Sequence, residues 1–281
     1  MSYDSIIRKY SKPVETVPTS FFREGSLSHA VRAVLFDVYG TLFVSKAGDI
    51  GVAETEANLN LPEIEGLLRR HGIGMPAGEI LERFFARIVA RKAALQKKGV
   101  DCPEVVIEDI WSDTLGIDDR ERLRLFALEY ELIVNPVYPM PHLPELLDTC
   151  RVRGLPMGII SNAQFYTPYL FSALLNRSLD ELGFVDDFIF FSYRLGYGKP
   201  SPRLFDRVRH AVGKAGIESK NILFVGNDML KDIWPASQAG FQTALFAGDG
   251  RSLNLRENDE RCENVRPDVT VTDLLQIVEY L

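Results

Sequence analysis

The stretch Val34–Leu42, which reads Val-Leu-Phe-Asp-Val-Tyr-Gly-Thr-Leu, constrains the fold of this chain most. An apolar run with strand character ends in Asp37, and a glycine turn and Thr41 follow. Runs this apolar are typical of a strand covered on both faces in a parallel α/β sheet. Ligands bind at the carboxyl ends of such strands. Asp37 therefore stands where a carboxylate attacks a substrate or holds a metal, or else where an aspartate caps a turn.

Alternating strands and helices follow in the C-terminal half, with residues 136–139 as a proline-rich hinge that stops the preceding helix. Helices are expected over 141–153, 164–175, 202–215 and 230–239, and strands over 156–160, 188–192, 222–225, 242–246 and 269–271. Together with a strand over 32–36, this alternation predicts an α/β fold with a doubly wound, Rossmann-like parallel sheet.

Residues 47–135 instead show helical periodicity throughout. About four helices are expected, over 61–71, 76–98, 103–115 and 118–134, and their aromatic residues are assigned to a bundle core. The chain thus divides into an N-terminal extension (1–30) that packs on the core or frays, a core (31–46 and 136–281) and a helical insertion (47–135).

Three later segments, together with the first, resemble the motifs of the haloacid dehalogenase (HAD) superfamily, and they occur in the family's order. They are Ile159-Ile160-Ser161-Asn162, Gly198-Lys199-Pro200-Ser201-Pro202, and Val225-Gly226-Asn227-Asp228-Met229-Leu230-Lys231-Asp232. The resemblance implies a HAD core whose α-helical cap domain is the insertion after the first motif. It also implies a hydrolase that acts on a small-molecule substrate.

The resemblance assigns Asp37 as the nucleophile of an aspartyl intermediate, with Thr41 among the catalytic residues. Ser161 would bind the phosphate by a hydrogen bond and Lys199 would bind it as a point charge, while Asn162 would support either one. Two plainer interpretations stay open, because Ser161 can cap the next helix and Lys199 can be a solvated side chain.

A Mg²⁺ site is expected from Asp37, Asp228 and Asp232, since oxygen ligands suit this ion and one or two carboxylates are usual. The resemblance adds the main-chain carbonyl of Tyr39. Family members often carry Asp directly after the glycine, where this chain has Asn227, so Asp228 is favoured by a one-residue shift. Asp232 is either a ligand or an acidic residue in the first turn of a helix.

Tyr39 departs from the family's phosphatases, which usually carry a second Asp there to protonate the leaving oxygen. Tyrosine, with a pKa near ~10, is a poor general base at neutral pH, and 2-haloacid dehalogenases carry Tyr at this position. Three functions follow in order: a Mg²⁺-dependent phosphatase of a small phosphorylated metabolite, a 2-haloacid dehalogenase, and a catalytically weak binding protein.

Composition limits the partners. A formal net charge of −7 disfavours binding to nucleic acid, which depends on clustered Lys and Arg. Three cysteines without CxxC spacing fit a reducing compartment and give no zinc pattern. No apolar run approaches the ~20 residues that span a bilayer, and the N-terminal segment has no apolar signal core. A cytoplasmic protein without membrane contact is expected.

Overall fold

The computed structural model describes residues 2–45 and 50–281, and side chains from residue 53 onward in the second range. Most strands form one seven-stranded sheet in the order β1-β9-β8-β7-β2-β5-β6. Its members are β1 (Glu24–Gly25), β2 (Ala33–Phe36), β5 (Met157–Ser161), β6 (Phe184–Phe191), β7 (Ile222–Gly226), β8 (Gln242–Phe246) and β9 (Val269–Val271). All neighbours are parallel except β1, which runs antiparallel to β9. The predicted α/β class with a mostly parallel sheet is confirmed.

Both faces of the sheet are buried, which explains its apolar strands. Along β2, Val34 and Phe36 belong to one hydrophobic cluster, while Ala33 and Leu35 belong to another on the opposite face. The helices that cover the sheet are α7 (Leu143–Val152), α8 (Thr167–Leu175), α9 (Leu179–Leu182), α11 (Pro202–Lys214) and α12 (Trp234–Gln238). Because a strand alternates its side chains, a strand between two helical layers must be apolar at every position.

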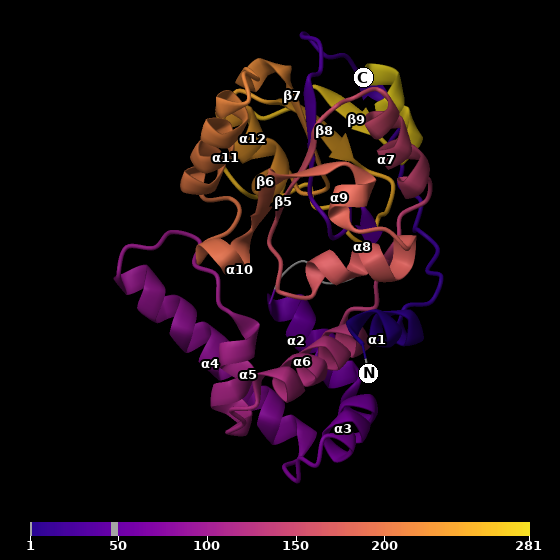
Figure 1. The fold of residues 1–281 in the computed structure, drawn as a ribbon. Helices are drawn as coiled ribbons and strands as arrows, with labels where there is room; N and C mark the ends of the chain where they lie inside the picture. Colours follow the sequence, from indigo (N-terminus) through magenta and orange to yellow (C-terminus); the bar gives the residue numbers. More distant parts are fainter. Residues whose placement is uncertain (1, 46–49) are drawn as a thin grey trace.

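Five helices between β3 and β4 lie at one end of the molecule, away from the large sheet (Figure 1). They are α2 (Ile50–Leu59), α3 (Leu61–Arg70), α4 (Ala77–Lys97), α5 (Ile107–Leu115) and α6 (Arg120–Val134). Their core is aromatic, with Phe84 stacked on Trp111 at a centroid distance of 3.9 Å and Tyr130 packed edge-on against both. The expected boundary at residues 46–47 lies outside the described residues.

Two short strands join this helical segment to the sheet. β3 (Phe43–Val44) pairs antiparallel with β4 (Tyr138–Pro139), so the outgoing and returning connections lie side by side. Ser45 also donates a 2.9 Å hydrogen bond to Asn135 Oδ1.

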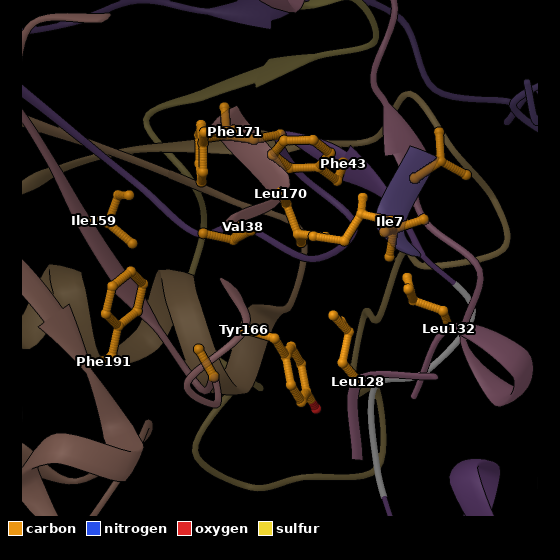
Figure 2. Packing of buried hydrophobic residues seen from close by; sticks show 14 of the residues in the cluster. Ile7, Val38, Phe43, Leu128, Leu132, Ile159, Tyr166, Leu170, Phe171 and Phe191 are labelled. Carbon is orange, nitrogen blue, oxygen red and sulfur yellow. The ribbon is translucent and has the colours of Figure 1, made fainter. Parts of the chain in front are cut away.

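The N-terminal segment is built into the fold. Helix α1 (Tyr3–Tyr10) contacts both α6 and α8, and Ile6 and Ile7 are fully buried. Figure 2 shows Ile7 in the same apolar cluster as Phe43, Leu170 and Leu132. Further along, Thr19 donates a hydrogen bond to the main-chain oxygen of Ala247 before the chain enters β1.

Short elements complete the structure: α10 (Ser192–Leu195), the 3₁₀ turns η1 (Ser219–Asn221) and η3 (Leu274–Tyr280), and the π-helical turn η2 (Met229–Ile233). The single helix expected over 230–239 is therefore η2 followed by α12. Pro235 lies at the start of α12 and has no N–H to donate, which is why a continuous α-helix does not form there. Among the described residues, no helix has the length and apolar character needed to cross a bilayer.

Candidate active site

Asp37 lies directly after the carboxyl end of β2, in the middle of the sheet. Its main-chain N–H donates to the oxygen of Val225 at 2.9 Å, which extends the β2–β7 ladder by one residue. The next turn requires Gly40, whose φ is +82° and whose missing side chain leaves room for Asn227; an added Cβ would lie 2.5 Å from Asn227 Nδ2. The Asp37 side chain keeps 11% of its surface exposed.

Lys199 brings two of the predicted motifs together at Asp37. Its Nζ lies 2.8 Å from Asp37 Oδ1 and 2.5 Å from Asp232 Oδ1, and only 2% of its side chain is exposed. Burial by itself lowers the pKa of the Lys199 ammonium, but the charges of Asp232 and Asp37 outweigh burial and raise that pKa above its usual value. The ammonium therefore stays charged between two carboxylates.

Asp232 is held in place from both of its oxygens. Oδ2 accepts hydrogen bonds from the main-chain N–H groups of Asn227 (3.0 Å) and Asp228 (2.9 Å), while Oδ1 meets Lys199. Gly226 permits this approach, because an added Cβ would lie 2.4 Å from the Asp232 carboxyl carbon. Burial, followed by the charges of Asp37 and Asp228, raises the pKa of Asp232 to about 7, although Lys199 acts in the opposite direction.

Asp228 makes a different set of contacts. Arg256 holds its carboxylate from two nitrogens, with Nη2 at 2.6 Å and Nε at 3.1 Å from Oδ2. The same carboxylate caps η2 by accepting from the N–H groups of Leu230 and Lys231. Arg256 was not predicted as a site residue, because it follows 28 positions later in an irregular segment that no motif marks.

The two amides of the motifs are occupied by structural hydrogen bonds. Asn227 accepts from the Thr41 hydroxyl at 3.1 Å and donates to the Ser252 carbonyl at 2.6 Å. Asn162 accepts from the Lys199 N–H at 2.7 Å and donates to the Lys199 carbonyl at 3.1 Å. Thr41 and Asn162 thus position Asn227 and Lys199, respectively.

Ser161 ends β5, the strand beside β2, and the register pairs Phe36 with Ile159 two positions earlier. Its side chain is fully buried, and its hydroxyl has no hydrogen-bond partner among the described residues. A buried hydroxyl left in this condition costs free energy, so a ligand oxygen at this place would satisfy it.

The Tyr39 hydroxyl is engaged by a neighbour and stays protonated near neutral pH, so it is a poor general base. Its hydroxyl lies 2.8 Å from the Thr167 hydroxyl at the start of α8. Burial, followed by the charge of Glu131 and then that of Asp37, raises the pKa of Tyr39 well above its usual value.

The net charge of the side chains around Asp37 allows a cation to bind. When Asp232 is ionised, Asp37 and Asp232 carry two negative charges against the single positive charge of Lys199, while Asp228 is balanced by Arg256. A buried site with one uncompensated negative charge is costly, and a bound cation or a proton relieves it. Within residues 2–45 and 50–281, no group of three or more His, Cys, Asp or Glu side chains is arranged to hold a metal, so two carboxylates would have to suffice.

Known proteins resemble this chain in sequence and in fold. The family model of haloacid dehalogenase-like hydrolases matches residues 31–240. Phosphoglycolate phosphatase of Escherichia coli is 28% identical over 75% of this chain and 79% of its own length. Glyceraldehyde 3-phosphate phosphatase of Methanocaldococcus jannaschii is 24% identical over 89% of this chain and 97% of its own length.

Among solved structures, 2-haloacid dehalogenase from Pseudomonas syringae superposes with a TM-score of 0.53 at 20% identity, covering 89% of this chain and 97% of its own. A HAD phosphatase from Thermococcus onnurineus gives a TM-score of 0.50 at 21% identity, with the same coverage of both chains. At these identities the likeness concerns the fold.

Proposed function

Because this chain belongs to the haloacid dehalogenase-like hydrolase family, we propose that it is a phosphatase that cleaves a small phosphorylated metabolite through an aspartyl-phosphate intermediate. The observation that carries the proposal is the contact between Asp37 and Lys199, which sets a carboxylate and a buried ammonium side by side at the carboxyl edge of the sheet. The phosphatases related in sequence over three quarters of the chain support it.

Nucleophilic attack and the binding of the phosphoryl oxygens each have a residue. Asp37 attacks the phosphorus and displaces the leaving oxygen, and water then hydrolyses the acyl phosphate and restores the carboxylate. Lys199 neutralises charge on the phosphoryl oxygens, and the Ser161 hydroxyl, which has no partner among the described residues, donates to one of them. Asp232 and Asn162 hold Lys199 in place from its ammonium and its main chain.

Mg²⁺ would be held by Asp37 and Asp232, with the main-chain carbonyl of Tyr39 that the family resemblance implies. It would supply positive charge against the phosphate oxygens. The negative charge in excess around Lys199 when Asp232 is ionised supports this assignment. Asp228 is already paired with Arg256, so Asp232 replaces Asp228 as the favoured metal ligand from the fourth motif.

We also propose the division into core and cap. The core comprises residues 31–46 and 136–281, and the helices α2–α6 of residues 47–135 form a cap over the carboxyl ends of the strands. Support comes from a cavity of about 530 Å³ that is lined by both parts, by Tyr39 and Lys199 of the core and by Lys92 and Glu131 of the helical segment.

A second candidate, 2-haloacid dehalogenase, is favoured by Tyr39, because a leaving halide needs no proton and no acid stands at position 39. The charge count speaks against it, since a dehalogenase would bind an anionic haloacid beside Asp37 and Asp232 without a metal ion to offset their negative charge. The third candidate, a catalytically weak binding protein, also rests on the missing acid at position 39.

The test is a screen over phosphorylated metabolites with Mg²⁺ and with chelator, beside 2-chloropropionate. Turnover of phosphate esters that disappears with chelator is expected. A single turnover in ¹⁸O-labelled water separates the first two candidates: water attacks phosphorus in a phosphatase, so the label enters phosphate, whereas ester hydrolysis in a dehalogenase leaves it in the Asp37 carboxylate. No turnover of either class by folded protein would support the binding protein.

A further inference from the structure

Position 39, two residues after the nucleophile of the proposed phosphatase, carries no carboxyl group to donate a proton. Tyr39 occupies the position, and its hydroxyl is engaged by Thr167 at 2.8 Å. An alkoxide is a poor leaving group, so an alkyl phosphate needs a proton on the bridging oxygen as the bond to phosphorus breaks. Another group must supply that proton if such esters are substrates.

Among the described residues, two carboxyl side chains line the cavity that Tyr39 and Lys199 also line, and their contacts differ. Glu104 is occupied at both oxygens: Oε1 accepts from the N–H of Val105 and Oε2 accepts from the Ser192 hydroxyl, each at 2.9 Å. Glu131 on α6 faces the same cavity, where the Asn135 amide donates to its Oε1 at 3.0 Å.

The surroundings of Glu131 favour its neutral form. A second cavity of about 110 Å³ lies against it and is lined mainly by apolar and aromatic side chains, Trp111 and Tyr130 among them. Burial raises the pKa of the Glu131 carboxyl above its usual value, and hydrogen bonds from Asn135 and Tyr166 only partly oppose this. A carboxyl group that holds its proton near neutral pH is what general acid catalysis requires.

We propose that Glu131 is the general acid and base of this enzyme, so that the helical segment supplies the group that position 39 lacks. The inference rests on the proposed phosphatase function. In the first step the Glu131 proton passes to the bridging oxygen as the bond from phosphorus to that oxygen breaks and Asp37 bonds to phosphorus. In the second step the Glu131 carboxylate takes a proton from water while the water oxygen attacks phosphorus. The bond between phosphorus and the Asp37 oxygen breaks, which releases phosphate and restores the Asp37 carboxylate and the protonated Glu131.

Other titratable groups face Glu131 or its cavity and will influence its titration. The larger cavity is also lined by Tyr39, Lys92, Cys102, Glu104, Tyr166, Lys199 and Lys231, and the smaller one by Tyr130. The charges of Asp37 and Glu54 act on Tyr39 and Tyr130, respectively. Because several of these groups are acidic, a pH profile alone does not identify the effect of Glu131. The effect of a substitution at Glu131 must also be measured as a function of the leaving group.

The test compares kcat/KM for aryl and alkyl phosphates, with Mg²⁺ and across pH, in wild type, Glu131→Gln and Glu104→Gln. In Glu131→Gln we expect kcat/KM for alkyl phosphates to fall by ~10²–10⁴-fold. The kcat/KM for nitrophenyl phosphate should change by only a few-fold, because nitrophenolate leaves without a proton. The decrease in kcat/KM for alkyl phosphates at alkaline pH, where Glu131 loses its proton, should disappear as well. Glu104→Gln is the matched control, since it removes the other carboxyl of the cavity, and it should keep the wild-type ratio.

Equal losses of kcat/KM on both ester classes in Glu131→Gln, or no loss on either, would overturn the inference. Activity of the wild type on phosphate esters would still support the phosphatase function in that case. If Glu131→Gln fails to fold, the wild type alone decides, because a steep dependence of kcat/KM on leaving-group pKa means that no acid assists. A wild type inactive on every phosphate ester would overturn the proposed function, and the inference with it.

Discussion

Lys199 and Asp232 form a buried ion pair in which Nζ lies 2.5 Å from Oδ1, with 2% of the lysine side chain and none of the aspartate side chain exposed. The pair joins the third and fourth motifs, and Lys199 extends it to the Asp37 carboxylate. This arrangement makes Asp232 the carboxylate of the fourth motif that bears on the nucleophile.

Lys199→Met should lose activity and stability together. The variant leaves the Asp37 and Asp232 carboxylates buried without their cation, which typically costs about 3–5 kcal/mol of unfolding free energy. Loss of the ammonium should also lower kcat/KM by ~10²–10³-fold. Urea unfolding and steady-state kinetics check both. Adding Asp232→Asn should recover part of the stability and none of the activity; a double variant that unfolds as easily as Lys199→Met would contradict the ion-pair assignment.

Asp232→Asn and Asp228→Asn should separate catalysis from stability. Asp232→Asn removes a proposed Mg²⁺ ligand and the partner of Lys199, so turnover and Mg²⁺ affinity by calorimetry should both collapse. Asp228→Asn weakens the contact with Arg256 and the cap on η2, so it should lower the unfolding free energy by about 1–2 kcal/mol and leave most of the turnover. The reverse order of effects on turnover would return Asp228 to the site.

The contrast between these two aspartates shows where the sequence stops being informative. A spacing of four residues suggests one helix face, but η2 is a π-helical turn capped by Asp228 itself, and Arg256 reaches that carboxylate from 28 positions away. The strands of β7 and β8 were predictable to within a residue, because burial on both faces demands an uninterrupted apolar run. Helix α1 was not predicted, since eight residues with two buried isoleucines acquire their partners only in the folded chain.

Acid should weaken the contact between α1, α3 and α6 at Glu129. Its carboxylate accepts from Tyr10 (2.8 Å) and Arg70 (2.9 Å) and meets His71 at 3.0 Å. The hydrogen bond to His71, followed by those to Arg70 and Tyr10, lowers the pKa of Glu129 from 4.5 to about 2 against the effect of burial. Because the folded-state pKa is the lower one, the stabilisation is complete above pH 4.5 and is lost as pH falls through about 2.

Unfolding free energy measured across that range should therefore fall further in wild type than in Glu129→Gln. The difference should be about 1–2 kcal/mol, since solvent screens part of the interaction. Parallel pH curves for the two proteins would contradict the assignment.

Tyr39→Phe should leave turnover within a few-fold of wild type. The hydroxyl contacts Thr167 and has a raised pKa, so its removal takes no proton donor from the reaction. The loss of one buried hydrogen bond should cost about 1 kcal/mol of unfolding free energy. A large loss of kcat on alkyl phosphates, with the fold intact, would instead make Tyr39 the proton donor and exclude Glu131.

The central claim is that Asp37 carries the phosphoryl group during turnover. The direct measurement is acid quenching of wild type during turnover of an aryl phosphate, followed by mass spectrometry of its peptides, beside Asp37→Asn treated in the same way. The account predicts covalent phosphate on the peptide that contains Asp37 in wild type and none in Asp37→Asn, which should be folded and inactive. Phosphate trapped on another residue, or an Asp37→Asn protein that turns over at the wild-type rate, would contradict it.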